Sequence, residues 1–279
     1  MSGFLEHKVS FKELKDIANN LRKRIIETGA NSRIPHIGSC LSCLDLLVYL
    51  YWNELDIDPQ KPIDPYRDRF LLSKGHGAPA LFQVLAERGF FDKERLLEFG
   101  QPGSVFHEHP PKPGYIPGVE AATGSLGHGL SMALGMAISA KLTDKKYRCY
   151  VILSDGECNE GSIWEAALLA PALKLNNLTA IIDFNKWQAT GRSEEVMSLQ
   201  PLNLKWQSFG WHVQEINGHE FHEIEEAVRN AKLVKNKPSM IVANTIKGKG
   251  VSFMEDDNNW HYKIPNKDEL KLALEELGF

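Results

Sequence analysis

The sequence predicts an α/β fold, namely a doubly wound, mostly parallel sheet with helices on both faces, formed as a single domain over residues 1–279. Three observations support this prediction. Short, continuous apolar runs alternate with helical patterns, as is typical of parallel strands that are buried on both faces. The 279 residues, 43% of them hydrophobic, are enough for one large buried core. The sequence also contains no internal repeat, low-complexity tract or recognisable interdomain linker.

Two helices are expected before the first strand. Ser10 precedes the amphipathic stretch FKELKDIANNLRKRIIETG and is a favourable N-cap. Gly29 is a typical C-terminal stop, so the first helix should end there. The second helix, Leu41 to Trp52, is almost uniformly apolar and should therefore be buried.

Five apolar runs predict the strands of the sheet. They are RFLLS (69–73), YRCYVILSD (147–155), LTAIIDF (178–184), WHVQEI (211–216) and PSMIVANT (238–245). Helical patterns follow the first, second and fourth runs, at residues 77–89, 161–175 and 221–234. A loop is expected after the third run, and a loop with a last helix after the fifth.

Residues 100–123, GQPGSVFHEHPPKPGYIPGVEAAT, interrupt this alternation. The segment is rich in Pro and Gly and has no hydrophobic period. A connection of this length inside a compact domain is usually functional or disordered, and the histidines in this one favour a functional loop.

Composition and charge exclude several classes of partner. The formal net charge is −4 and the Lys and Arg residues are scattered, so the basic patch of a nucleic-acid-binding protein is missing. The N-terminal stretch MSGFLEHKVSFKELKD lacks the apolar core of a signal peptide, and no segment approaches the roughly 20 apolar residues of a membrane span. We therefore expect no nucleic-acid partner, no membrane partner and a cytoplasmic location.

The four cysteines, Cys40, Cys43, Cys149 and Cys158, are too few for a disulfide scaffold and are expected to stay reduced. The Cys40-x-x-Cys43 pair leaves a redox or zinc site as an alternative. That alternative is disfavoured because no second ligand pair accompanies it and because LSCLDLLVYLYW has the pattern of a buried helix.

Asp155 and Asn185 occupy matching positions at the ends of two successive predicted strands. They are 30 residues apart, about the length of one βαβ unit, so parallel strands would bring both to one edge of the sheet. A carboxylate and an amide oxygen suit Mg²⁺ or Ca²⁺, with phosphate oxygens and waters completing the coordination. Gly156 would let the backbone approach such a phosphate. The alternative is an ordinary turn residue at each position.

Four histidines lie in Gly/Pro-rich or polar loops rather than on apolar faces: His36, His76, His109 and His261. They lack zinc spacing, and no serine or cysteine nucleophile motif accompanies them. Imidazoles around a dry pocket can donate to a developing alkoxide, move protons or bind phosphate. This pattern favours carbonyl chemistry on a polyhydroxylated substrate, with surface hydrogen bonding as the alternative.

From about residue 14 to residue 270 the chain resembles the N-terminal, diphosphate-binding domain of transketolases. The family's thiamin diphosphate signature appears as Ser154-Asp155-Gly156 and, later, Asn185. Four further motifs occur in family order: LSKGHGAPA, VEAATGSLGHGLSMALGMA, EGSIWEAAL and KGKGVSFMEDDNNWH. The resemblance implies the thiamin-diphosphate-binding fold, with thiamin diphosphate and Mg²⁺ as cofactors and Ca²⁺ as the alternative metal.

The resemblance also implies roles for individual residues. Metal ligands would be Asp155, Asn185 and the backbone carbonyl of Trp187. Residues near the cofactor would be Ser39, His76, His109, Gly124, Leu126, Gly156, Asn185, Lys247 and His261. Proton transfer and alkoxide stabilisation would fall to His36, His76 and His261. Glu160 and Glu165 match acidic residues that lie at the subunit interface in the family.

Departures from the family pattern concern the substrate more than the chemistry. Ser154 replaces the usual Gly of the signature. His36 lies in a Pro-His-Ile-Gly-Ser context, His128 stands where Gln is usual, and Tyr262 stands where Gly usually follows His261. Because of His128 and Tyr262, the standard sugar phosphates are not necessarily the substrates.

Transketolases of full length continue into a pyrimidine-binding domain, which carries the essential glutamate that activates the cofactor. Nothing in this chain replaces that glutamate. We therefore expect one subunit of a split transketolase, which transfers a two-carbon ketol unit from a ketose to an aldose. A C-terminal subunit would supply the glutamate, and the working particle would be a heterotetramer. A truncated fragment is the alternative origin of such a chain.

Three other functions compete with this one. The first is another thiamin diphosphate enzyme, such as an α-keto-acid dehydrogenase subunit or a deoxyxylulose-phosphate synthase. These share the Asp-Gly and Asn pair but not the KGHGAP and Trp-His motifs. The second is a non-catalytic regulatory subunit, against which the intact histidines argue. The third, a dinucleotide-binding domain, is disfavoured because no G-x-G-x-x-G follows the first strand.

Overall fold

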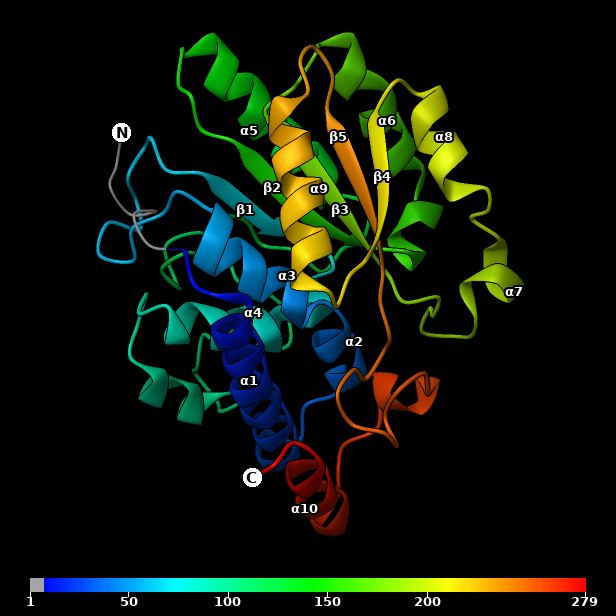
Figure 1. The fold of residues 1–279 in the computed structure, drawn as a ribbon. Helices are drawn as coiled ribbons and strands as arrows, with labels where there is room; N and C mark the ends of the chain where they lie inside the picture. Colours follow the sequence, from blue (N-terminus) through cyan, green and yellow to red (C-terminus); the bar gives the residue numbers. More distant parts are fainter. Residues whose placement is uncertain (1–7) are drawn as a thin grey trace.

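The computed structural model describes residues 8–279, and within that range five strands form a parallel sheet (Figure 1). In chain order the strands are β1 (Arg69–Leu72), β2 (Cys149–Ser154), β3 (Leu178–Phe184), β4 (His212–Asn217) and β5 (Ser239–Asn244). Their order across the sheet is β1-β2-β3-β5-β4. Each strand lies within a predicted apolar run, with β4 extending one residue further. Residues 1–7, the start of the stretch compared with a signal peptide, lie outside the described range.

Helices surround this sheet. The α-helices are α1 (Phe11–Ser32), α2 (Ile37–Ser42), α3 (Leu44–Tyr49), α4 (Ala78–Glu87), α5 (Gly129–Leu142), α6 (Gly161–Ala172), α7 (Ser193–Met197), α8 (Leu202–Ser208), α9 (Phe221–Leu233) and α10 (Lys267–Glu276). Shorter elements are the π-helical turn η2 (Leu50–Glu54) and the 3₁₀ turns η3 (Gly75–Gly77), η4 (Lys93–Glu98), η5 (Gly156–Asn159) and η6 (Asn258–His261).

Both faces of the sheet are buried, which confirms the predicted fold class. Tyr150 and Ile152 of β2 belong to one apolar cluster, which also includes residues of α1, α3, α4 and α9. Val151 and Leu153 face the opposite cluster, formed with α5, α6 and α8. Figure 1 shows α9 crossing in front of the sheet, with α6 behind it. The central strands are apolar on both sides because each face is covered, and each fully buried aliphatic side chain contributes about 1.5–3 kcal/mol to folding.

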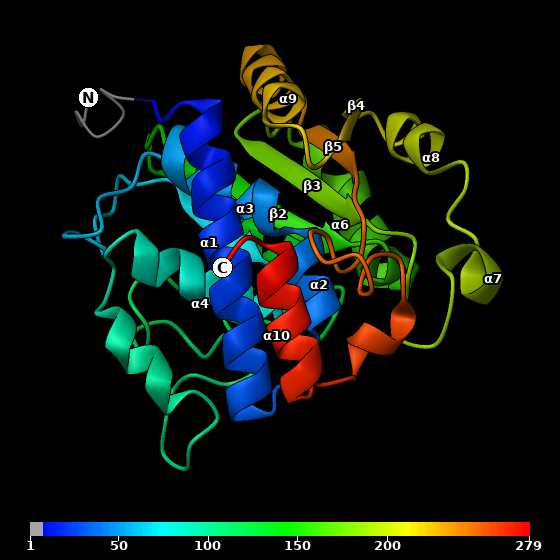
Figure 2. The same cartoon turned by 60° about the horizontal axis from the view of Figure 1, so that its bottom comes forward.

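The first and last helices pack side by side (Figure 2). The Asn19 side-chain amide on α1 donates a hydrogen bond to the Leu277 carbonyl oxygen, at 2.8 Å. Ala273 of α10 is fully buried in this contact. The C-terminal helix therefore belongs to the same core as α1.

The first two predicted helices needed correction. Helix α1 continues past Gly29 to Ser32 and ends at Arg33, which adopts a left-handed conformation (φ 54°) and closes the helix on the Gly29 carbonyl. Gly29 allows Ile37 to pack closely against α1, because a Cβ at position 29 would lie 2.3 Å from Ile37 Cδ1. The predicted helix from Leu41 to Trp52 begins earlier, at Ile37, and breaks at Cys43 into α2, α3 and η2.

Three helices were not predicted. Helix α5 was missed because its exposed positions include small residues such as Ser131, Gly135 and Ser139. No strongly polar face therefore marks it as amphipathic. The expected loop after β3 contains α7 and α8. At 5 and 7 residues these helices are too short for a hydrophobic period to be recognised.

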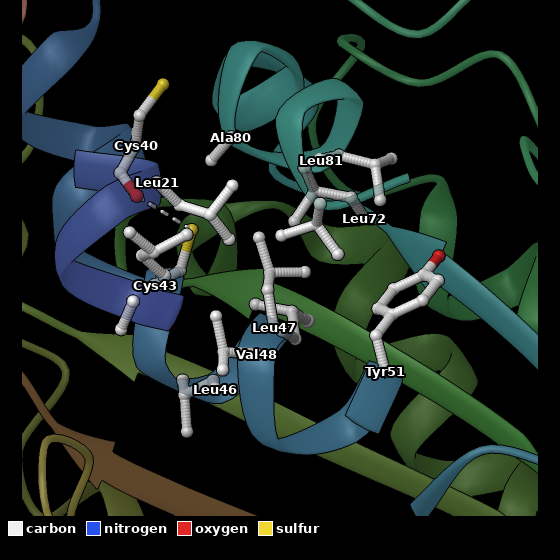
Figure 3. Packing of buried hydrophobic residues seen from close by; sticks show 14 of the residues in the cluster. Leu21, Cys40, Cys43, Leu46, Leu47, Val48, Tyr51, Leu72, Ala80 and Leu81 are labelled. Atoms are coloured by element: carbon white, nitrogen blue, oxygen red, sulfur yellow. Dashed lines mark hydrogen bonds between the residues drawn. The ribbon is translucent and has the colours of Figure 1, made fainter. Parts of the chain in front are cut away.

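The Cys40-x-x-Cys43 pair belongs to the core (Figure 3). Cys40 and Cys43 lie near Leu21 of α1 and Ala80 of α4, and the Cys43 thiol contacts the Cys40 carbonyl oxygen at 3.6 Å. Burial raises the pKa of both thiols to about 12. All four cysteines are free and buried, so their thiols are packing groups.

Among the described residues, none of the helices combines the length and the apolar character that crossing a bilayer requires.

Candidate active site

A cavity of about 450 Å³ opens at the carboxyl ends of β2 and β3. Ten of the twelve predicted site residues line it: His36, Ser39, His76, His109, Gly124, Leu126, Gly156, Asn185, Trp187 and His261. The other two, Asp155 and Lys247, are buried residues that contact the lining. The structure thus gathers side chains from residue 36 to residue 261 at one edge of the sheet. Open parallel sheets bind ligands at this edge.

Asp155 and Asn185 lie at the ends of neighbouring strands, because β2 and β3 pair in parallel with Ser154 opposite Asp183. The Asp155 carboxylate accepts hydrogen bonds from the Gly156 N–H at 2.9 Å and from the Ser193 hydroxyl at 2.8 Å. Burial raises the pKa of this carboxyl to about 6. Such a desolvated carboxylate has much to gain from a nearby cation.

Asn185 is held in a fixed orientation. Its side-chain oxygen accepts the Trp187 N–H at 3.0 Å, and its NH₂ group donates to the Ser42 hydroxyl at 3.3 Å. Between Asn185 and Trp187, Lys186 adopts a left-handed backbone (φ 69°). The tight turn brings the Trp187 main chain beside the Asn185 amide.

The donor chemistry fits a hard divalent cation that shares phosphate oxygens. Asp155 offers a carboxylate, Asn185 an amide oxygen and Trp187 a backbone carbonyl. Over residues 8–279, no group of three or more His, Cys, Asp or Glu side chains could hold a metal without further ligands. A ligand that brings its own oxygens is therefore the natural complement to this set.

Two glycines make room for a ligand or for its supporting loops. A Cβ at Gly156 would lie 3.2 Å from Gln188 Cγ, on the cavity wall. Gly124 has a φ of 135°, and a Cβ there would lie 2.6 Å from His109 Cδ2. Only glycine permits the 124 turn to approach His109 this closely.

The four loop histidines form one cluster. The ring centroid of His36 lies 4.9 Å from that of His261, 5.5 Å from that of His76 and 6.3 Å from that of His109. Burial, with help from neighbouring cationic groups, lowers the pKa of His36 to about 4 and that of His261 to about 3. Burial also places the pKa of His76 well below its usual value. The imidazoles of His36, His76 and His261 are therefore neutral near pH 7, and each can donate at one ring nitrogen and accept at the other.

Lys247 lies behind His261 and is almost completely buried. Its Nζ donates to Asn258 Oδ1 at 2.6 Å and lies 3.0 Å from His261 Nδ1. An ammonium group has no acceptor, so when Lys247 is protonated the proton of neutral His261 lies on Nε2. Burial and the charge of Lys74 lower the pKa of Lys247 to about 7. An anion in the cavity would raise this pKa and favour the charged form of Lys247.

Sequence reasoning missed a buried ion pair beneath the cavity. Lys74 and Asp183 are fully buried and directly hydrogen-bonded. Lys74 also donates to the Ser39 carbonyl oxygen at 2.9 Å, and Asp183 accepts the Ser42 hydroxyl at 2.6 Å. Burial opposes the charge on Lys74, but Asp183 outweighs it and raises the lysine pKa. The sequence did contain a signal for this pair. Lys74 directly follows the apolar run RFLLS, and Asp183 lies within the apolar run LTAIIDF.

The residues that depart from the family pattern occupy different places. Tyr262 packs against His261, with ring centroids 4.7 Å apart, and also faces His36 at 5.9 Å. His128 lines a neighbouring groove with Ser131 and Met132, and its Nδ1 lies 3.1 Å from the Leu126 carbonyl oxygen. Tyr262 therefore lies against two rings of the histidine cluster, and neither Tyr262 nor His128 is part of the cavity lining.

Comparison with known proteins identifies related chains. Residues 14–279 match the profile of a protein family described as "Transketolase, thiamine diphosphate binding domain". One subunit of the apulose-4-phosphate transketolase of Phocaeicola vulgatus is 43% identical over 257 residues, which are 92% of this chain and 91% of the relative. The 6-deoxy-6-sulfo-D-fructose transketolase subunit SqwG of a Clostridium species is 43% identical over 265 residues, covering 95% of this chain and 96% of that one.

A solved structure shares the fold. The crystal structure of transketolase from Campylobacter jejuni superposes with a TM-score of 0.91 at 31% sequence identity, over 97% of this chain. The matched part is 43% of the Campylobacter chain. The present chain thus spans less than half of that transketolase but nearly the whole of the two relatives that are named as subunits.

Proposed function

The chain belongs to the transketolase family as the N-terminal, thiamine diphosphate-binding subunit of a split enzyme, and we propose that its cavity holds the diphosphate of that cofactor through a magnesium ion. The observation that carries the proposal is the convergence of ten predicted residues on one cavity. Transketolases move a two-carbon ketol unit from a ketose to an aldose. The relatives' names favour this activity over a keto-acid dehydrogenase, a deoxyxylulose-phosphate synthase or a regulatory subunit.

Asp155, Asn185 and the Trp187 carbonyl would bind Mg²⁺, with Ca²⁺ as the alternative, because their oxygens are hard ligands. The Gly156 backbone would lie against the diphosphate, and Lys247 would face it as a cation whose pKa rises on contact. The wall toward the organic part of the cofactor would be formed by Ser39, His76, His109, Gly124 and Leu126. When bound, thiamine diphosphate supplies the carbanion-stabilising chemistry on which two-carbon transfer depends.

The histidine cluster would serve the substrate. His36, His76 and His261 are neutral and desolvated, so each can donate to an alkoxide or accept a hydroxyl proton as charge develops. Protonated Lys247, 3.0 Å from His261 Nδ1, would favour the tautomer in which Nε2 is the donor. Together the three imidazoles would hold and move protons on the reacting hydroxyl and carbonyl oxygens.

The substrates named for two relatives, together with Tyr262, support a proposal for the substrate class. One relative is named for apulose-4-phosphate and the other for a sulfonated fructose, so both names describe a ketose with an anionic tail. We propose that this chain acts on a ketose of the same kind, with Tyr262 narrowing access to His261.

The partner would be a C-terminal transketolase subunit that supplies the activating glutamate and the opposite wall of the site. We also propose a heterotetramer, in which two copies of this chain meet through α6. Leu168, Leu169 and Leu173 are exposed on or directly after α6, an unusual number for a helix in free solution. Glu165 lies on the same helix, and Glu160 at its start lines the cavity, which links this surface to the site. A cytoplasmic location is part of the proposal because the free cysteines suit a reducing compartment.

The test is to purify this chain together with its native C-terminal partner and to assay two-carbon transfer from ketose phosphates and sulfonated ketoses. The proposal predicts turnover that requires both subunits, thiamine diphosphate and a divalent cation. Turnover by one of the two subunits in isolation, or turnover that requires lipoamide or pyruvate, would contradict it. Asp155→Asn should abolish metal-dependent turnover, whereas Asp144→Asn, at a remote exposed position, should not.

A further inference from the structure

Trp187 is held by the side chains of Arg192 and Asp256, to which the proposed function assigns no role. The Asp256 carboxylate accepts the Trp187 indole N–H at 2.8 Å. It also accepts two hydrogen bonds from the Arg192 guanidinium, at 2.7 and 2.6 Å. The same guanidinium lies over the Trp187 ring, 3.7 Å from its centroid. The three side chains therefore form a closed set of contacts, here called the Trp187 clamp.

The clamp joins two loops that approach the cavity from different parts of the chain. Trp187 and Arg192 are paired across a short hairpin, residues 186–193, closed by the Gln188 N–H to Gly191 O bond at 2.8 Å and the Ser193 N–H to Lys186 O bond at 3.0 Å. Asp256 belongs to the loop that follows β5, residues 246–257. Its N–H donates to the Lys247 carbonyl oxygen at 2.8 Å.

Each loop carries a group that the proposed function assigns to the cofactor. The hairpin presents the Trp187 carbonyl, and at its far end the Ser193 hydroxyl holds Asp155 at 2.8 Å. The second loop presents Lys247. Asn258, which directly follows the second loop, also connects the two loops. Its side-chain oxygen accepts a hydrogen bond from Lys247, and its NH₂ group donates to the Ala189 carbonyl oxygen in the hairpin at 3.2 Å.

A single exposed ion pair would contribute little to loop order, since solvent screens it. The Trp187 clamp differs in geometry. The Arg192–Asp256 contact is bidentate and charge-assisted, the guanidinium is stacked on an aromatic ring, and the ring is hydrogen-bonded to the same carboxylate. Motion of any one side chain breaks contacts with both others.

The backbone needs such support. Lys186, immediately before Trp187, and Asp256 itself both have left-handed conformations, with φ of 69° and 58°. Non-glycine residues pay a conformational cost for this geometry, so neighbouring contacts must maintain it.

We propose that Asp256 and Arg192 are positioning residues that lock the Trp187 hairpin to the Lys247 loop and thereby preset the metal-facing carbonyl and the diphosphate-facing lysine at one spacing. The inference rests on the proposed function, since it assigns the clamp a purpose at that site. It predicts that loss of the clamp weakens metal-dependent assembly of the site more than it slows the reaction once the site is filled.

The first arm of the test needs neither cofactor nor partner. Hydrogen exchange of the metal-free chain is compared for the wild type, Asp256→Asn, Arg192→Gln and a matched surface control, Glu275→Gln, which breaks an exposed pair on α10. Exchange at the amides of residues 187–193 should accelerate at least about 5-fold in the two clamp variants and stay unchanged in the control. Unchanged exchange in the clamp variants would overturn the inference.

The second arm uses the two-subunit enzyme. The Mg²⁺ concentration for half-maximal activation should rise about 10-fold in Asp256→Asn and Arg192→Gln, while turnover at saturating Mg²⁺ and cofactor stays within about 2-fold of wild type. The double variant should be no worse than the more affected single variant, because both changes remove the same contacts. Trp187→Phe keeps the stacked ring, loses the N–H and should have a smaller effect.

The arms separate the two claims. If the wild-type enzyme shows no dependence on thiamine diphosphate and metal, the proposed function fails, while the exchange arm still tests the clamp. If exchange accelerates but the Mg²⁺ requirement is unchanged, the clamp is structural only and the positioning role is wrong.

Discussion

Lys74 and Asp183 form an ion pair from which solvent is completely excluded, directly beneath Ser39 and Asn185. Each partner satisfies further groups: Lys74 donates to the Ser39 carbonyl oxygen, and Asp183 accepts from Ser42 and Thr245. Two charges at this depth are stable only together, since an isolated buried charge carries a desolvation penalty that nothing offsets. The pair therefore holds Ser39, Ser42 and Thr245 in place beneath the cavity.

Removing only one partner of this pair should greatly reduce the stability of the fold. Lys74→Met leaves the Asp183 carboxylate unpaired and should lower the free energy of unfolding by about 3–5 kcal/mol. The double variant Lys74→Met/Asp183→Asn removes both charges while keeping one of the two side-chain oxygens that accept from Ser42 and Thr245, so it should recover part of that loss. Urea unfolding of the single and the double variant measures the loss and the recovery. A single variant as stable as wild type would refute the role given to the pair, and Asp144→Asn, in an exposed pair, serves as control.

Removing His76 or His261 should reduce turnover more than it reduces cofactor binding. The expected loss for His76→Ala or His261→Ala is roughly 10²- to 10⁴-fold in turnover, the scale of a general acid–base group. Steady-state kinetics of the two-subunit enzyme and calorimetric titration of the cofactor separate the two effects. His222→Ala changes an exposed histidine of α9 and should alter neither. Equal losses in turnover and in cofactor affinity would assign these histidines to binding instead.

The histidine cluster should make the metal-free chain sensitive to acid. The pKa values of His36 and His261 fall from 6.5 to about 4 and about 3 in the folded state. Between pH 6.5 and those values the unfolded chain binds more protons than the folded one, so stability is fully present above pH 6.5 and declines as pH falls through that window.

Urea unfolding at pH 7.5 and pH 5 measures this decline, and His36→Asn should reduce it. NMR of the imidazole protons should show no titration of these rings between pH 8 and pH 5.5. Titration of His36 or His261 near pH 6.5 would contradict the assignment of neutral rings.

The α6 surface should control assembly but not the fold. Leu168→Glu together with Leu169→Glu places charge on two exposed positions, so the free chain should unfold at nearly the wild-type urea concentration. The complex with the C-terminal subunit should shift from the proposed heterotetramer to a smaller particle, as measured by light scattering after size-exclusion chromatography. Leu233→Glu, at an exposed position on α9, is the matched control. An unchanged particle mass would exclude α6 as the contact.

The sequence alone predicted the parts of this structure that follow local pattern. The strands were found because parallel strands covered on both faces are continuously apolar, as in Cys149–Ser154. The placement of Asp155 and Asn185 at the ends of neighbouring strands followed from the length of one βαβ unit. The predicted end of α1 was wrong because Gly29 is required by its close packing against Ile37 and not as a helix stop. This tertiary contact leaves no signal in the local sequence pattern.

The missed parts depend on contacts between distant residues. Lys74 and Asp183 are 109 positions apart, and Arg192 and Asp256 are 64 apart. Each residue alone looks like an ordinary charged side chain, and only the folded arrangement reveals a buried pair in one case and a clamp on Trp187 in the other. Helices α7 and α8 were missed for a different reason, because they are too short to show a period.

The central claim is that this chain provides the metal-holding half of a cofactor site that a second subunit completes. The most direct measurement is calorimetric titration of thiamine diphosphate, in the presence of Mg²⁺, into this chain alone and into its complex with the C-terminal subunit. We expect weak binding to the chain alone and affinity at least about 100-fold higher in the complex, because the partner supplies the other wall and its binding energy. Micromolar binding by the isolated chain, unchanged when the partner is added, would contradict the account.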